Sequence, residues 1–223
     1  MPPMRTHLLP LLSLFSLLVA PTWATPVVVE LFTSKYCPNC PAAEKKLHGL
    51  AAADTGMVIL QQHVDYWDQG TRKDPFGLAD ATQRQYDYSN TIGRRPGEVF
   101  TPMPLLNGTF VAEPPLWMNW DTAYAEAQKG PQPAALALKL TPDGGLEAAL
   151  PESLGADSDA WVMGVEPIAG HANILRVRAI VQARTAKGRA TLAKALLPAT
   201  PQWVLLVQKP SNGALLGFGQ LKN

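Results

Sequence analysis

The sequence predicts an α/β fold followed by a β-rich C-terminal half, and three observations support this. The 223 residues are 47% hydrophobic with a formal net charge of +1, which is typical of a folded chain and excludes extended disorder. Strand-like and helix-like stretches alternate from residue 25 to about 130, the pattern of an α/β unit. Beyond Pro133, short alternating strands separated by turn signals predict a small β-sandwich. We therefore expect an α/β domain over 25–130 and a sandwich-like domain over 131–223.

The first 24 residues resemble a secretory signal peptide. Arg5 supplies the positive charge, an apolar run extends from Leu8 to Ala20, and Thr22-Trp23-Ala24 places small residues where a signal peptidase reads them. The apolar run is too short to cross roughly 30 Å of hydrocarbon. We expect cleavage after Ala24 and a periplasmic or secreted mature chain with no membrane span, and an uncleaved anchor is the alternative. The near-neutral charge argues against nucleic acid or acidic lipid as the main partner.

The first half has a clear order of elements. A β-branched run from Val27 to Phe32 predicts a buried central strand, and apolar residues at helical spacing after Cys37 predict an amphipathic helix. Further elements follow: a strand from Met57 to Val64, a polar helix from Leu78 to Asn90, a hairpin from Pro102 to Ala112 turning at Asn107-Gly108, and a helix from Leu116 to Gln128.

The second half consists of apolar alternation between turns. Pro142-Asp143-Gly144-Gly145 and Pro210-Ser211-Asn212-Gly213 are the clearest turn signals. The alternating stretches between and around them predict strands near residues 136–140, 146–150, 161–165, 174–184, 203–207 and 214–218.

The two cysteines form a single Cys-x-x-Cys motif, Cys37-Pro38-Asn39-Cys40, between a predicted strand and a predicted helix. We expect Cys37 in the N-cap region and Pro38 at the first helical position, where its missing N–H costs nothing. The positive end of the helix favours a thiolate at Cys37, and Cys40 lies one turn later, where it can resolve a mixed disulfide. This context predicts a thiol–disulfide oxidoreductase that uses the Cys37–Cys40 disulfide and no other cofactor, with protein or small-molecule thiols and disulfides as partners.

Three other interpretations remain open. The pair could be a structural disulfide, although so short a loop gains little chain entropy. With His63, it could bind copper or zinc, which would make the chain a metal-binding module. It could also be an inert remnant on a fold that binds a partner without catalysis. The sequence does not fix the partner, the direction of electron transfer or the oligomeric state.

Several other side chains are candidates for supporting roles. Glu30 lies in an otherwise apolar strand and could exchange a proton with Cys40 through water, or it could instead pair with a base. His63 and Asp65 share a strand face, so a His–Asp pair near the cysteines is a further candidate. Tyr36 is an aromatic residue beside the nucleophile and could line a docking groove.

The order of elements resembles the thioredoxin fold. In thioredoxin-like proteins a cis-proline begins the strand that faces the active cysteines, and Thr101-Pro102 holds the corresponding place. The resemblance implies a catalytic role for Pro102 and substrate contacts at Thr101 and Met103. A cis X-Pro bond is the minority state, and a trans proline that opens an edge strand is the ordinary alternative.

The chain is also similar to a secreted bacterial family called domain of unknown function 1223, over roughly 27–111. The matching motifs are Val29-Glu30-Leu31-Phe32-Thr33-Ser34, Cys37 to Ala42, His63 to Asp68, Lys73-Asp74-Pro75-Phe76, Arg84-Gln85-Tyr86 and Phe100-Thr101-Pro102. The chain departs from the family pattern at Gly70-Thr71-Arg72 and at Met103, both expected at the rim of the site. The resemblance therefore implies a fold and a site but no known substrate.

Overall fold

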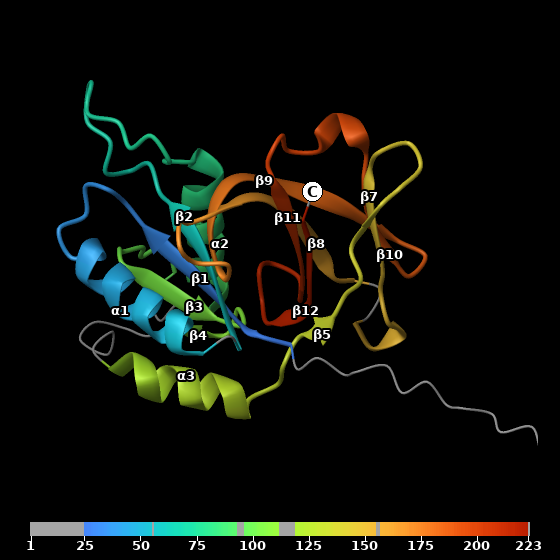
Figure 1. Ribbon diagram of the computed structural model, residues 1–223, viewed down its shortest axis with the longest axis horizontal. Helices are drawn as coiled ribbons and strands as arrows, with labels where there is room; N and C mark the ends of the chain where they lie inside the picture. Colours follow the sequence, from blue (N-terminus) through green and yellow to red (C-terminus); the bar gives the residue numbers. More distant parts are fainter. Residues whose placement is uncertain (1–24, 55, 93–95, 112–118, 155–156, 223) are drawn as a thin grey trace, which may run out of the picture.

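The computed structural model describes residues 25–54, 56–92, 96–111, 119–154 and 157–222. The predicted signal peptide lies outside these residues, and its cleavage stays a prediction. The described chain is a mixed α/β fold built on a central mixed sheet, with a β-rich C-terminal part (Figure 1). Among the described residues, no helix is long and apolar enough to cross a membrane.

The N-terminal part places three helices around four strands. Strand β1 (Val27–Thr33) pairs in parallel with β2 (Met57–His63) and antiparallel with β3 (Met103–Leu106), and β3 pairs with β4 (Phe110–Val111). The helices are α1 (Cys40–Ala53), α2 (Ala79–Ile92) and α3 (Trp120–Lys129). All these elements were predicted, with boundaries that differ by a few residues.

Alternation along β1 decides which helices cover which face of the sheet. Val29 and Leu31 pack in one core cluster with Leu47 of α1 and with Trp120 of α3. Phe32 points to the other face and belongs to the cluster that contains Tyr88 of α2. Helices α1 and α3 therefore cover one face and α2 covers the other, as Figure 1 shows.

The C-terminal part continues the N-terminal sheet. Strand β9 (Ile174–Ala186) pairs in parallel with β2, so the order runs β4-β3-β1-β2-β9-β8-β11-β12-β5. The other strands are β5 (Ala134–Ala135), β6 (Lys139–Leu140), β7 (Leu146–Ala149), β8 (Asp159–Pro167), β10 (Arg189–Leu192), β11 (Gln202–Gln208) and β12 (Leu215–Lys222), with short 3-10 turns at Glu152–Leu154 and Lys194–Leu196.

The C-terminal part is β-rich as expected, but it continues the N-terminal sheet. The predicted C-terminal strands form, but the long strands β8, β9 and β11 extend the sheet that carries β1 and β2 (Figure 1). Apolar alternation shows that a stretch is a strand with one or two buried faces, and it does not show which strand lies beside it. The division at residue 130 stays a prediction.

The β3–β4 hairpin confirms its predicted turn. Asn107 and Gly108 both have positive φ, 49° and 66°, the backbone of a tight primed turn. The Asn107 carbonyl accepts the N–H of Leu215, and its side chain accepts the N–H of Val28. The hairpin is thus fastened both to the central strand and to the C-terminal part.

Candidate functional site

Cys37 and Cys40 form a disulfide at the start of α1, with Cα atoms 5.4 Å apart. The helix begins at Cys40 with Asn39 as its N-cap, and Pro41 occupies the first turn. The predicted helix start at Pro38 is therefore two residues early, because a turn intervenes in which the Cys40 N–H donates to the Cys37 carbonyl. Cys37 lies just before the helix, at its amino end.

The helix start is electrostatically open. The Asn39 side chain makes no capping hydrogen bond, and the first turn contains no acidic residue. Nothing in that turn therefore neutralises the partial positive charge of the helix end, which favours a negative sulfur placed there.

The oxidised pair is buried. Cys37 is 2% exposed and Cys40 is fully buried, whereas Pro38 and Asn39 between them are exposed. In this oxidised form the motif presents its loop to solvent and keeps its sulfurs beneath.

The Thr101-Pro102 bond is cis, as the resemblance implies. Met103 pairs with Phe32 on β1, so Pro102 lies beside Thr33, the last residue before the cysteine loop. The hydroxyl of Thr101 accepts a hydrogen bond from the Trp67 indole N–H at 2.8 Å. Sheet pairing thus places the cis-proline at the same end of β1 as the disulfide.

Met103 is buried and does not line the rim as expected. It is 2% exposed, and its sulfur is 3.3 Å from the side-chain amide of Gln85 on α2. The same amide donates to the Phe100 carbonyl at 2.7 Å. Gln85 therefore holds the segment around the cis-proline against α2.

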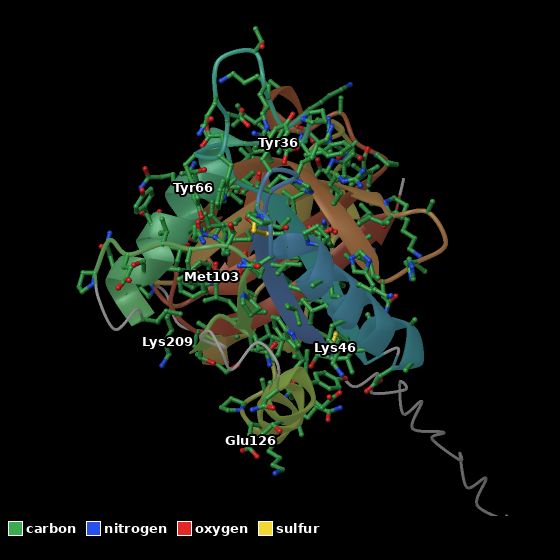
Figure 2. All side chains as sticks on the ribbon, turned by 90° about the vertical axis from the view of Figure 1, so that its left-hand side faces the viewer. Tyr36, Lys46, Tyr66, Met103, Glu126 and Lys209 are labelled. Atoms are coloured by element: carbon green, nitrogen blue, oxygen red, sulfur yellow. A yellow bond between two sulfur atoms is a disulfide. The ribbon has the colours of Figure 1, made fainter. Side chains whose placement is uncertain are left out.

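Aromatic side chains lie at the surface beside this segment. Tyr66 and Tyr86 are among the exposed large hydrophobic residues, and the Tyr66 ring is 6.4 Å from that of Trp67. Partial burial raises the pKa of Tyr66 to about 12, so its hydroxyl stays protonated at any physiological pH. In the view of Figure 2, the disulfide lies between the labelled Tyr36, Tyr66 and Met103.

Tyr36 is half-buried and held by the loop between β2 and α2. Its hydroxyl donates to the Lys73 carbonyl at 3.2 Å, and the Arg72 guanidinium lies 4.2 Å from its ring centre. Whether Tyr36 lines a docking groove stays a prediction. Its present partners make it a clasp between the cysteine loop and the loop of residues 64–78.

His63 pairs with Asp74 and not with Asp65. The His63 Nδ1 atom lies 2.8 Å from an Asp74 oxygen that also accepts the Lys35 N–H at 2.7 Å. Burial opposes ionisation of Asp74, but these hydrogen bonds and that from the Phe76 N–H outweigh it and lower the pKa of this carboxyl. Asp65 instead accepts the Thr82 hydroxyl near the start of α2.

Asp74 is the functional candidate that the residue pattern did not single out. It lies in Lys73-Asp74-Pro75-Phe76, one of the motifs that carry the family resemblance. Its side chain is fully buried and holds the segment that leads to Cys37. The only feature of the sequence that pointed to Asp74 was its place as a carboxylate beside a proline in a family motif.

Glu30 is paired with a base, the second of its two interpretations. Both of its oxygens accept hydrogen bonds from Arg84, at 2.7 and 2.9 Å, and Gln62 and Tyr88 add further donors. Its partners Arg84 and Tyr88 belong to α2, so Glu30 faces away from α1 and Cys40. This placement argues against proton exchange between Glu30 and Cys40, because the sheet separates the two side chains.

The metal alternative gains no support from the geometry of the described residues. Among them, no group of three or more His, Cys, Asp or Glu side chains is arranged to hold a metal ion. The Nδ1 atom of His63 is engaged by Asp74, and its Nε2 atom lies 3.4 Å from the Gln61 amide. Cys37, Cys40 and His63 are therefore not assembled as a ligand set.

Comparison with solved structures shows the same fold elsewhere. A protein from Agrobacterium tumefaciens matches with a TM-score of 0.64 and 23% identity, over 90% of this chain and 95% of the other. HBP35 of Porphyromonas gingivalis matches with a TM-score of 0.58 and 15% identity, over 90% of this chain and 76% of the other. No curated protein matches the sequence. The model of a family described as a protein of unknown function, DUF1223, matches residues 28–190, and the chain belongs to that family.

Proposed function

We propose that the protein is an extracytoplasmic thiol–disulfide oxidoreductase on a thioredoxin-like fold, with Cys37 as nucleophile and Cys40 as resolving cysteine. The observation that carries the proposal is the disulfide at an uncapped helix start, at the same end of β1 as Pro102. A structural staple would not need the open helix end.

The reaction is an exchange of sulfur–sulfur bonds. The Cys37 thiolate attacks one sulfur of a partner disulfide, and the partner's other sulfur leaves as a thiolate. The Cys40 thiol then loses its proton and attacks Cys37, which releases the second partner sulfur and restores the Cys37–Cys40 disulfide. The partner gains two electrons and the protein loses two, and the reverse sequence oxidises a partner dithiol.

Burial of the pair favours small or flexible partners. Cys37 is only 2% exposed. A thiolate must approach its sulfur along the line of the S–S bond, and a thiolate on a rigid protein surface reaches that position poorly. A low-molecular-weight thiol or an extended peptide segment requires less displacement of the exposed Pro38-Asn39 turn. The signal-like segment at residues 1–24 supports action in the periplasm or outside the cell, where oxidised cysteines persist.

A redox titration tests the proposal. The protein is equilibrated in glutathione buffers of defined ratio, and the free thiols are labelled. We expect one reversible two-electron transition, together with covalent adducts on Cys37 in a Cys40→Ala variant. A Cys37→Ala variant is the matched control and should trap nothing. A pair that never reduces while the protein stays folded would leave a structural disulfide as the better interpretation.

A further inference from the structure

We propose that Glu44, and not Glu30, exchanges the proton with Cys40 when the disulfide opens and closes. This inference rests on the proposed function and assigns the general acid–base group of that site. With Glu30 committed to Arg84 on the far face of the sheet, the resolving thiol needs another proton acceptor.

Helix α1 places Glu44 next to Cys40. Cys40, Glu44 and His48 follow one another at intervals of four residues along α1, so their side chains share one stripe of the helix. Side chains at this spacing have Cβ atoms about 5–6 Å apart, within reach of each other directly or through one water. The neighbouring stripe, with Ala43 and Leu47, packs into the apolar core and holds the helix orientation.

The Glu44 carboxylate is held in place from the sheet. The hydroxyl of Thr33 donates to one Glu44 oxygen at 2.5 Å, and Thr33 is fully buried at the end of β1. The second oxygen has no hydrogen-bond partner among the described residues. One oxygen therefore anchors the carboxylate beneath the cysteine loop, and the other is free for a proton.

The stripe continues towards the turn between β8 and β9. His48 lies one turn beyond Glu44, and its ring centre is 5.7 Å from that of His171 in the turn between β8 and β9. Burial lowers the pKa of the His48 ring below its ordinary value, although Gln61 and the charge of Glu44 oppose this shift, so the ring is neutral at neutral pH. His48 therefore lies beside Glu44 on the stripe as an uncharged neighbour.

Two ionisable side chains on neighbouring strands, His63 and Arg176, already have partners. On β2, His63 is bound to Asp74. On β9, Arg176 lies opposite Gln61 and pairs with Glu166 of β8 at 3.1 Å. Of the carboxylates on this face, Glu44 alone shares a helix stripe with Cys40.

The proton transfer balances with the exchange of bonds. As the Cys40 sulfur attacks Cys37 in the mixed disulfide, its proton passes to Glu44. The new S–S bond forms, the Cys37–partner bond breaks, and the partner leaves as a thiolate. In the opening direction, a partner thiolate attacks the Cys37 sulfur, the Cys37–Cys40 bond breaks, and Glu44 returns the proton to the departing Cys40 thiolate.

The test follows the two steps separately in the full-length mature chain. Reduced protein is mixed with dithiobis(nitrobenzoate), which releases one coloured thiolate when Cys37 attacks and a second when Cys40 closes the disulfide. In Glu44→Gln we expect an unchanged first step and a second step slowed roughly 10²-fold near pH 6. The deficit should disappear at alkaline pH, where the Cys40 thiol ionises without help.

Controls separate this role from a structural one. Glu126→Gln alters an exposed glutamate of α3 and should leave both steps unchanged. Glu44→Asp keeps a carboxylate and should recover part of the rate of the second step. If Glu44→Gln folds poorly, Glu44→Asp still tests the role of the carboxylate. The role of Glu44 would be overturned if the second step were equally fast in the parent, Glu44→Gln and Glu44→Asp over the whole pH range. A parent protein that releases no coloured thiolate would overturn the proposed function itself.

Discussion

The carboxylate of Asp74 accepts the backbone N–H of Lys35 at 2.7 Å, only two residues before Cys37. The same oxygen lies 2.8 Å from His63 and 3.4 Å from the hydroxyl of Ser34. One fully buried carboxylate therefore fastens the cysteine loop to the end of β2 and to the loop of residues 64–78. The position of the cysteine loop therefore depends on a residue that lies 37 positions after Cys37 in the sequence.

Removing this charge should loosen the cysteine loop. An Asp74→Asn variant keeps one acceptor oxygen but puts an NH2 group where the other oxygen accepted the N–H of Lys35 or of Phe76, so we expect a loss of about 1–3 kcal/mol in the free energy of unfolding. Dithiothreitol should also reduce the disulfide faster, because the turn over the sulfurs yields more easily. Urea denaturation and the rate of thiol appearance measure the two effects. Asp80→Asn, at an exposed position of α2, is the control. If Asp74→Asn unfolds at the same urea concentration as the parent and is reduced at the same rate, Asp74 does not hold the cysteine loop in place.

The same carboxyl should make stability depend on pH. The folded pKa of Asp74 is lowered from its ordinary 3.8, so ionised Asp74 contributes stability above about pH 4. That contribution falls as the pH drops below the unfolded value and is lost once the folded group is protonated. We therefore expect the parent to lose more stability than Asp74→Asn between about pH 5 and pH 2. Denaturation curves across this range give the difference, and parallel curves would contradict it.

The buried Glu30–Arg84 pair should be far more sensitive to single changes than to a double change. Arg84→Met leaves the Glu30 carboxylate buried without its cation, which typically costs about 3–5 kcal/mol. Adding Glu30→Gln to Arg84→Met removes the unpaired charge and should recover part of that loss. Denaturant unfolding of the two single variants and the double variant measures the coupling. Additive losses would show that the pair is not a unit.

The sequence predicted elements whose signals are local. The Asn107-Gly108 turn, the helix after Cys37 and the strand from Val27 all formed, because turn chemistry and periodicity are written in neighbouring residues. The cis bond at Pro102 was implied by the order of elements that the chain shares with a known fold.

The interactions that were missed join distant segments. Arg84 on α2 binds Glu30, 54 residues before it, and Gln208, 124 residues after it. Periodicity shows that a polar side chain occupies a buried position, but it does not show which residue it binds. For the same reason, strand alternation did not reveal that β9 would lie beside β2.

The hairpin turn offers a test of how the two parts of the sheet are joined. A Cβ at Gly108 would lie 2.8 Å from the Gly213 carbonyl, besides requiring φ of +66°. Gly108→Ala should therefore lower stability by about 1–3 kcal/mol. Gly170→Ala has a similar φ of +83° but nothing within 4 Å, so it isolates the backbone contribution and should lose less. Thermal unfolding compares them, and equal losses would mean that the contact with Gly213 adjusts freely.

The depth of the disulfide predicts a preference among reductants. Cys37 and Cys40 are both buried, so a small thiol should reach the sulfurs with less rearrangement than a folded protein reductant. We expect the reduction rate per thiolate to be higher for dithiothreitol than for a thioredoxin of comparable potential. Replacing Tyr36 by Ala removes its contacts with Arg72 and Lys73 and should narrow this difference. Stopped-flow tryptophan fluorescence follows both reactions. A folded protein that reduces the parent faster than the small thiol would show that docking itself opens the loop.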